Sequence, residues 1–246
     1  MSPSVLTGID VSPLSLRIAA VALWLGLIGL LAKFFQQKAG AGPEVVRKIV
    51  HMGVGNVILF AWWLNLPTWV GVTASSLFSA ITLLSYRLPI LPGLESVGRK
   101  SWGTFFYAVS IGVLIAWFWP QQRPQYAVIG ILIMTWGDGL AALVGQNFGR
   151  HPYRAWGILK SWEGSSAMAS ASFLVCGLIL CSVQGPIWQT WLVAFAVAIG
   201  ATGLEALSKF GVDNLLAPIG SAALAFGLNE WLLAIGNAGQ ATSSFH

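Results

Sequence analysis

The chain has 246 residues, of which 56% are hydrophobic and 9% are charged, and its formal net charge is +5. A soluble domain carries about 25% charged residues, so the composition excludes an ordinary soluble globular protein. It also excludes an intrinsically disordered chain, because such chains combine low hydrophobicity with high charge. The composition therefore predicts an all-α, polytopic bundle of membrane helices without a soluble domain.

Eight apolar segments approach the ~20 residues that a helix needs to cross a bilayer. We place them at roughly 14–32, 51–66, 67–86, 103–119, 126–146, 164–183, 187–207 and 214–235. The second is the weakest, because it is short and because Asn65 and Pro67 interrupt it. If it were re-entrant, seven crossings would remain. Little chain is left between the segments, so we expect a single membrane domain over residues 1–246.

Lysine and arginine are concentrated in alternate loops. The loops after the first, third, fifth and seventh segments hold 11 of the 13 basic residues, and the opposite side holds only Arg17 and Arg123. The positive-inside rule then places those four loops in the cytoplasm and both termini on the opposite side. Topology thus accounts for the net charge. We expect the lipid bilayer as a partner, no nucleic acid and no obligatory protein partner.

Two basic groups stand at the cytoplasmic starts of segments. The first reads RKIVH and contains Arg47, Lys48 and His51. His51 follows Arg47 by four residues, so the two share a face of a helix. The group could bind a phosphate, or its cations could anchor the segment at the interface. For the second group, Arg99 and Lys100, we favour the anchor.

The most specific feature is a buried carboxylate between two glycines. Asp138 lies inside the fifth segment, flanked by Gly137 and Gly139. A carboxylate inside a membrane segment costs about 2.5–3.5 kcal/mol and usually has a function. On a straight helix Asp138 would lie about 18 Å from Arg150. We therefore expect that the glycines break the helix, or that a polar cavity reaches the carboxylate.

A glycine-rich stretch that includes Arg150 and Lys160 follows that carboxylate. Lys160 and Ser161 precede the sixth segment, and a helix N-terminus favours phosphate. Glu163 would be favoured there by the same dipole. The stretch is no Walker A loop, since Leu159 stands where that motif has glycine directly before its lysine.

Two further acidic positions lie on the same side of the membrane. Glu205 is near the end of the seventh segment, and Asp213 and Asn214 open the eighth, where they could equally be ordinary capping residues. Mg²⁺ bound to a nucleotide uses one or two carboxylates together with phosphate oxygens, and phosphoryl transfer relies on positioning and charge neutralisation. Carboxylates and cations on one face therefore indicate a Mg²⁺–nucleotide site.

These residues resemble the motifs of the CTP-dependent polyprenol kinase family. The resemblance is carried by RKIVH, by GDGLAALVGQNFGR followed by KSWEGS, and by GVDNLLAP after Glu205, and it covers about residues 44–235. In length the chain is most like the phytol and farnesol kinases. The resemblance implies transfer of the γ-phosphate of CTP, with Mg²⁺, to a long-chain isoprenoid alcohol taken from the bilayer. Phytol, geranylgeraniol and farnesol are candidates, and phytyl phosphate would serve tocopherol synthesis and phytol salvage.

The resemblance also implies roles for particular residues. The catalytic residues would be Asp138, Lys160 and Glu205. The residues that bind the nucleotide and its phosphates would be Arg47, Lys48, His51, Gly137, Gly139, Gly145, Gly149, Arg150, Ser161, Glu163, Gly164 and Asn214. The ligands of Mg²⁺ would be Asp138, Glu205 and Asp213.

Two other functions use the same features. A cytidylyltransferase that makes a CDP-lipid from a lipid phosphate would need the same nucleotide, metal and membrane side. A transporter could place Asp138 at a broken helix in the middle of the membrane. The clustering of the polar motifs on one face and the lack of a visible repeat weigh against the transporter.

Overall fold

The computed structural model describes residues 13–37, 43–86, 102–155, 157–207 and 211–243. Its helices are α1 (Leu14–Gln37), α2 (Pro43–Gly55), α3 (Val57–Trp63), α4 (Thr68–Ser85), α5 (Gly103–Phe118), α6 (Pro124–Leu132), the π-helical turn η1 (Ile133–Asp138), α7 (Gly139–Phe148), α8 (Trp162–Gln184), α9 (Trp188–Leu207) and α10 (Asp213–Ser243). Two strands, β1 (Pro152–Ala155) and β2 (Ile158–Ser161), complete the described elements.

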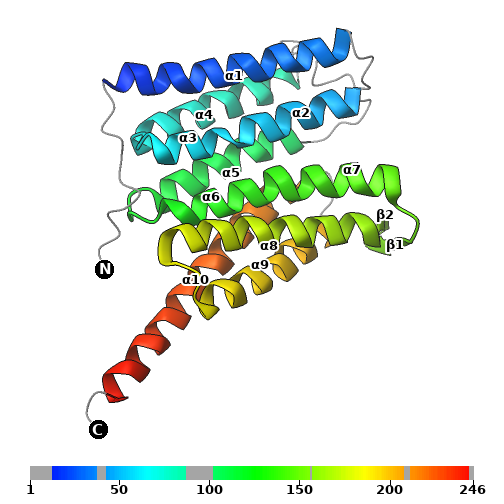
Figure 1. The fold of residues 1–246 in the computed structure, drawn as a ribbon. Coiled ribbons are helices and arrows are strands. Elements are labelled where there is room, and N and C mark those ends of the chain that lie inside the picture. Colours follow the sequence, from blue (N-terminus) through cyan, green and yellow to red (C-terminus); the bar gives the residue numbers. More distant parts are fainter. Residues whose placement is uncertain (1–12, 38–42, 87–101, 156, 208–210, 244–246) are drawn as a thin grey trace.

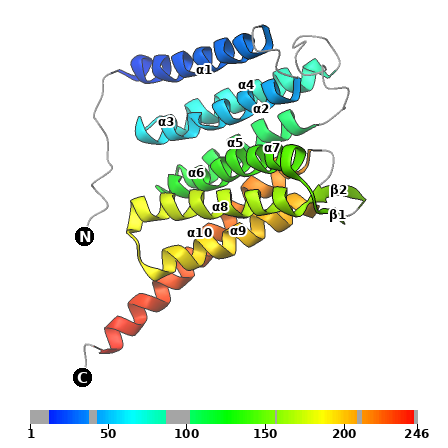
Figure 2. The same cartoon turned by 45° about the vertical axis from the view of Figure 1, so that its right-hand side comes forward.

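The helices form a bundle in which most axes run side by side along one direction (Figure 1). Helix α1 lies at one margin, on α2 and α3, while α8 and α9 form the other margin (Figure 2). Among the described residues, seven helical segments are long and apolar enough to cross a membrane, and α5 is a shorter apolar helix. The all-α membrane bundle is thus confirmed, and each of the eight predicted segments is helical.

The second segment runs the full length of the bundle as α2 followed by α3 (Figure 1). The two helices are separated at Asn56, whose side-chain amide donates to the carbonyl of Met52 over 2.9 Å. The predicted start at residue 51 is wrong, because the helix begins at Pro43, a residue well suited to a first helical position. Arg47, Lys48 and His51 therefore lie within the helix and not ahead of it.

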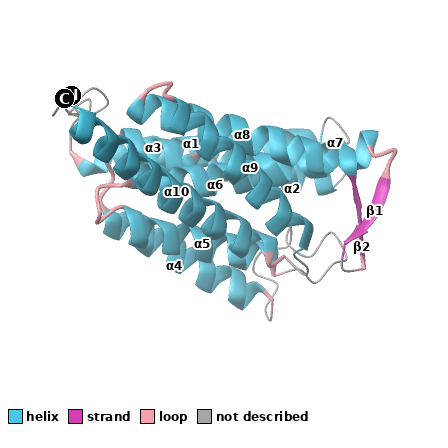
Figure 3. Ribbon diagram, turned by 90° about the horizontal axis from the view of Figure 1, so that it is seen from below, coloured by secondary structure: helices cyan, strands magenta, loops and turns pink. Residues whose placement is uncertain are grey.

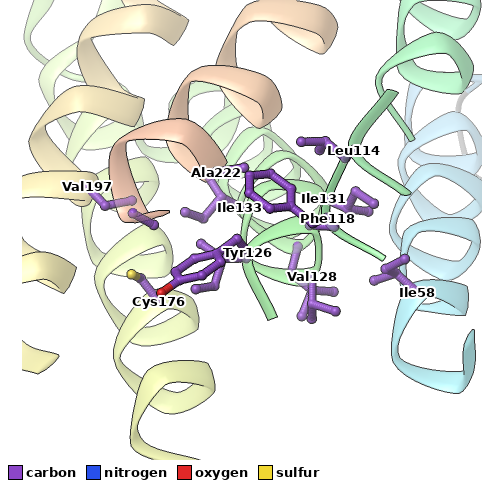
Figure 4. Close-up of a cluster of buried hydrophobic side chains, with 14 of the residues drawn as sticks. Ile58, Leu114, Phe118, Tyr126, Val128, Ile131, Ile133, Cys176, Val197 and Ala222 are labelled. Atoms are coloured by element: carbon purple, nitrogen blue, oxygen red, sulfur yellow. The ribbon is translucent and has the colours of Figure 1, made fainter. Parts of the chain in front are cut away.

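The apolar core is centred on α6, which has neighbours on every side. Every residue of α6 from Gln125 to Leu132 is buried. Figure 4 shows Phe118 of α5, Tyr126 of α6 and Ala222 of α10 gathered in this cluster. Helix α10 comes so close that a Cβ at Gly130 would overlap the backbone carbonyl of Pro218. A helix surrounded in this way is apolar on all faces, which is why α6 shows no helical stripe in the sequence.

A β-hairpin joins α7 to α8 beyond the ends of those helices (Figure 3). Strands β1 and β2 are antiparallel, with Tyr153 opposite Lys160 and Arg154 opposite Leu159. The turn contains Gly157 at a φ of 80°, a conformation that favours glycine. The all-α prediction lacked this hairpin, because four-residue strands are too short to show an alternating pattern among polar residues.

The two ends of the bundle differ in what they carry. The first turn of α1 and the last turn of α10 lie at one end, and the hairpin lies at the other (Figure 1). That arrangement agrees with an even number of crossings. The end with the hairpin also holds the start of α2 and the end of α7, and is here called the motif end.

Candidate functional site

Asp138 is the last residue of the π-helical turn η1, in a helix that continues without a break from Pro124 to Phe148. The expectation that the flanking glycines break the helix is wrong. They serve close packing instead. A Cβ at Gly137 would lie 2.5 Å from the sulfur of Met168, and one at Gly139 would lie 3.0 Å from Met52. Turns of π-helix are rare and frequently occur at functional sites, so η1 marks Asp138 independently of its charge.

Lys48 forms a buried ion pair with Asp138. Its ammonium lies 2.5 Å from the Oδ2 atom of Asp138 and 3.3 Å from the backbone carbonyl of the same residue. Lys48 is only 3% exposed, so it does not act as an interface anchor. Buried charges are tolerated when they are paired. The pair therefore explains how a lysine and an aspartate both lie inside a membrane bundle.

His51 lies beside this pair, one turn further along α2. Its Nε2–H donates to the carbonyl of Met134 over 3.3 Å, and the same nitrogen is 3.8 Å from Oδ2 of Asp138. Its ring packs on that of Tyr107, with centroids 4.4 Å apart. The hydroxyl of Tyr107 is in turn 2.8 Å from that of Thr135 in η1. RKIVH thus meets Asp138 directly.

The sequence analysis missed Tyr107 and Thr135. The available signal was a tyrosine in an apolar segment. The chain has four tyrosines, and a buried tyrosine hydroxyl usually needs a polar partner. The sequence did not reveal the partner, because Thr135 is 28 positions away and threonine is common in membrane helices.

Lys160 and Glu205 form a second ion pair of the same design. The ammonium of Lys160, in β2, donates to the carboxylate of Glu205 near the end of α9, and lies 3.4 Å from the backbone carbonyl of Glu205. Glu205 is only 6% exposed. In both pairs, therefore, one ammonium binds the carboxylate and the carbonyl of one acidic residue.

Asp213 connects the two ion pairs. It is the first residue of α10, and its carboxylate interacts electrostatically with Asp138, Glu205 and Lys160. No lysine, arginine or histidine of the described ranges forms an ion pair with it. Side chains from α2, η1, β2, α9 and α10 therefore form one charged cluster at the motif end. Arg47 belongs to it as well, since it interacts electrostatically with Asp138 and with His51.

The donor set of the cluster fits Mg²⁺ that arrives with a nucleotide. Within the part of the chain that the structure describes, no three His, Cys, Asp or Glu side chains group into a ready-made metal site. Mg²⁺ usually binds one or two carboxylates together with phosphate oxygens and water. Asp213 lies within electrostatic reach of both Asp138 and Glu205. This arrangement suits a shared cation better than a resident one.

The predicted glycines downstream of Asp138 have a clear packing role. A Cβ at Gly164 would lie 2.9 Å from the carbonyl of Ala141, and a Cβ at Gly149 or Gly145 would lie 3.0 or 3.2 Å from Ser161. They allow α7 to approach the start of α8 closely. Contact of Gly145, Gly149 and Gly164 with a nucleotide stays a prediction.

The remaining predicted residues lie around the hairpin. The hydroxyl of Ser161 accepts the N–H of Gly164 over 3.1 Å and so caps α8. Glu163 lies in the first turn of α8 and binds the ring of His151 over 2.6 Å. Arg150 is exposed just beyond α7. These contacts are separate from the Lys48–Asp138 and Lys160–Glu205 ion pairs.

Two predicted features near the loops have different outcomes. Asn214 donates to the carbonyl of Gly211 over 3.3 Å, so its side chain closes the turn before α10. Arg99 and Lys100 lie outside the described residues, and their expected role as anchors stays a prediction.

Comparison with known proteins finds several relatives of this chain. A phytol kinase of Synechocystis sp. is 50% identical over 221 residues, which cover 89% of this chain and 95% of the relative. A CTP-dependent diacylglycerol kinase of Schizosaccharomyces pombe is 26% identical over 213 residues, 74% of this chain and 92% of the relative. A chloroplastic farnesol kinase of Arabidopsis thaliana is 31% identical over 166 residues, 61% of this chain and 50% of the relative. No protein-family model matches the chain, and no solved structure is significantly similar to it.

Proposed function

The chain belongs to the polyprenol kinase family, and from that premise we propose that it transfers the γ-phosphate of CTP to an isoprenoid alcohol, with phytol as the first candidate. The observation that carries the proposal is the 50% identity with a phytol kinase over 89% of this chain. The charged cluster at the motif end supports it, because it combines carboxylates with cations as a Mg²⁺–nucleotide requires.

The reaction joins the alcohol oxygen to the γ-phosphorus of CTP. The bond from that phosphorus to the oxygen bridging the β- and γ-phosphates breaks, and CDP leaves. The hydroxyl proton passes to a carboxylate, for which Glu205 and Asp213 are the candidates. Lys48 and Lys160 neutralise phosphate oxygens, with Arg47 and Arg150 as further cations. Such charge neutralisation and positioning supply most of the catalysis in phosphoryl transfer.

Asp138, Glu205 and Asp213 would hold Mg²⁺, which supplies positive charge to the phosphates. Asp138 and Glu205 are bound by lysines in the structure. The triphosphate carries more negative charge than a single carboxylate, so each lysine can exchange its carboxylate partner for a phosphate oxygen when CTP binds. Because a bare buried carboxylate is costly, that exchange favours nucleotide and cation binding together.

The two substrates reach the cluster by different routes. The excess of lysine and arginine in the loops of the motif end supports a cytoplasmic position for that end, so CTP arrives from the cytoplasm. The alcohol is an oil-soluble chain with one hydroxyl. It enters from the bilayer and presents the hydroxyl at the interface, where the charged cluster meets the membrane segments.

The test uses membranes of a host that expresses the full chain, incubated with Mg²⁺, phytol and CTP labelled at the γ-phosphate. We expect label in phytyl monophosphate in the lipid extract. The Asp138→Asn variant should lose at least about a hundredfold of the activity, a typical scale for one such group. The matched control is Glu230→Gln, which makes the same change at a carboxylate that binds Arg123 and Tyr126 in the other half of the bundle.

Two results would contradict the kinase. Lipid labelled from CTP carrying its label at the α-phosphate, with a lipid phosphate as acceptor, would indicate a cytidylyltransferase. Absence of labelled lipid with phytol, geranylgeraniol, farnesol and diacylglycerol, from a correctly folded chain, would leave a transporter as the alternative.

A further inference from the structure

We propose that Tyr107 and Thr135 are positioning residues of the site, which hold the ring of His51 against the π-helical turn that carries Asp138. The inference rests on the proposed function, because it assigns these residues to the same reaction. It starts from a polar contact between three helices. Tyr107 comes from α5, Thr135 from η1 and His51 from α2.

The hydrogen bond between the two hydroxyls has a defined direction. The Thr135 hydroxyl donates to the carbonyl of Ile131 over 2.6 Å. Since a hydroxyl has one proton, Tyr107 must donate to Thr135 across the 2.8 Å between them. Thr135 is fully buried and Tyr107 is 5% exposed. Removal of the Thr135 hydroxyl would leave the buried hydroxyl of Tyr107 without this partner, which is unfavourable.

The same tyrosine also supports His51. The planes of the two rings are inclined by 33°, so the phenol covers one face of the imidazole. The edge of the imidazole then faces η1, where its Nε2 meets Met134 and Asp138. Tyr107 therefore binds η1 with its hydroxyl and locates a residue of α2 with its ring.

Gly55 shows that α2 closes tightly onto this contact. A Cβ at Gly55 would lie 2.6 Å from the methyl carbon of Thr135, and nearer still to the hydroxyls of Thr135 and Tyr107. No larger residue fits there without displacing the hydrogen bond. The contact is thus enclosed by α2 on one side and by η1 on the other.

The position of these contacts along η1 links them to the chemistry. Each of the three residues accepts a hydrogen bond. The Met134 carbonyl accepts from His51, the Thr135 hydroxyl from Tyr107 and the Asp138 carboxylate from Lys48. One π-helical turn is therefore held at three successive points by two neighbouring helices. A misplacement of about 1 Å at a reacting group can cost a hundredfold in rate, so loosening this contact should reduce turnover without removing any group that touches substrate.

The kinetic test compares Tyr107→Leu, Tyr107→Phe and Thr135→Val in the labelled-CTP assay. We expect Tyr107→Leu to lower kcat about 10–100-fold, as is typical for supporting residues, with the KM for CTP changed by less than about twofold. Tyr107→Phe keeps the ring and should recover most of that loss. The double variant Tyr107→Phe, Thr135→Val should have a kcat no lower than that of either single variant, because each change removes the same hydrogen bond.

Tyr126→Leu is the matched control for Tyr107→Leu, and Tyr126→Phe is the matched control for Tyr107→Phe. Tyr126 is a fully buried tyrosine in α6, and its hydroxyl binds Glu230 and Asn229 in the other half of the bundle. Replacing Tyr126 should destabilise the fold about as much as replacing Tyr107, but at a place outside the charged cluster. An equal fall in kcat in these variants would overturn the proposal, since it would show a general effect on the fold.

A second measurement needs no substrate. The chain has three histidines, so labelling with isotopic histidine gives three ring signals by NMR, and His51→Gln identifies one of them. Tyr107→Leu should shift the His51 signals and leave those of the exposed His151 in place. Unshifted His51 signals would overturn the positioning role. A wild-type chain that transfers no phosphate would overturn the proposed function instead.

Discussion

At the scale of single residues, the notable feature is that Lys48 and Lys160 are each bound to one acidic residue at two points. Lys48 meets the carboxylate and the carbonyl of Asp138, and Lys160 meets those of Glu205. The lysine neutralises the acid and also satisfies a backbone carbonyl. Each ammonium is therefore held in a defined place before any nucleotide arrives.

Removal of one partner should destabilise the protein more than removal of both. Lys48→Met would leave the Asp138 carboxylate buried and unpaired, at a cost of about 3–5 kcal/mol. The double variant Lys48→Met, Asp138→Leu should regain most of that stability. Unfolding in detergent measures it, with the exposed Lys33→Met as the control. Equal stability of the two lysine variants would contradict a buried pair.

Asp213 should respond to a different measurement. No basic residue of the described ranges pairs with its carboxylate, so we expect Asp213→Asn to leave the unfolding temperature nearly unchanged. If Asp213 contributes to Mg²⁺ binding, the Mg²⁺ concentration for half-maximal activity should rise at least about tenfold. An unchanged Mg²⁺ requirement would exclude it as a ligand. Glu230→Gln, at a carboxylate outside the cluster, serves as the control.

At the scale of elements, the helix from Pro124 to Phe148 organises the molecule. Its first half is buried on all sides, and its second half carries Asp138 toward α2. The first half depends on Gly130, where α10 approaches through the backbone of Pro218. In membrane bundles small residues allow such close approach.

Gly130→Ala should therefore loosen the contact between α6 and α10. The added methyl group meets a backbone carbonyl, which cannot move aside as a flexible side chain can. We expect a loss of about 1–3 kcal/mol in unfolding free energy, the usual cost of overpacking. Gly227→Ala, on α10 with no atom within 4 Å of the added Cβ, should show no loss. Equal effects would mean that the close approach is unimportant.

The sequence predicted the elements better than their irregularities. Hydropathy located the eight helices, and their charges located the motif end. The hairpin was missed because its strands are short, and the π-helical turn and the early start of α2 were missed because their polar residues are explained by contacts with distant segments. Lys48 shows the reason. A lysine near the end of a segment indicates an interface anchor, and only its pairing with Asp138, 90 positions away, places it inside a helix.

The candidate site was predicted in part. RKIVH, Asp138, Lys160, Glu205 and Asp213 do gather in one cluster, because all of them lie toward the motif end of the bundle. Which acid pairs with which lysine was not predictable, since the chain order of the helices does not determine their neighbours. The packing role of the glycines was hidden for the same reason.

At the scale of the whole molecule, the arrangement of the helices separates a charged end from an end that carries Arg123 and Glu230. The hairpin and the loop between α5 and α6 lie at opposite ends of the bundle (Figure 1). Positions in these two loops can therefore establish the orientation in the membrane.

Cysteine labelling tests that orientation. Leu159 in the hairpin is 67% exposed, and Gln121 after α5 is exposed as well. An impermeant maleimide should label Gln121→Cys in intact spheroplasts, and Leu159→Cys only after the membrane is opened. The parent chain is the control, because Cys176 and Cys181 lie within α8. The reverse pattern would place the motif end outside the cell.

The π-helical turn changes the direction in which the side chains of its helix point. An α-helix advances about 100° per residue, and a π-turn accommodates one residue more than the regular helix. The π-helical turn therefore rotates the side-chain directions of the second half of the helix relative to those of the first half. Tyr126 can then face α10 while Asp138 faces α2. Deletion of a single residue from η1 would restore a uniform phase and turn the carboxylate away from Lys48. The shortened chain should still insert and fold as a bundle. When the first half of the helix packs on α10, however, Asp138 in the second half would no longer face Lys48.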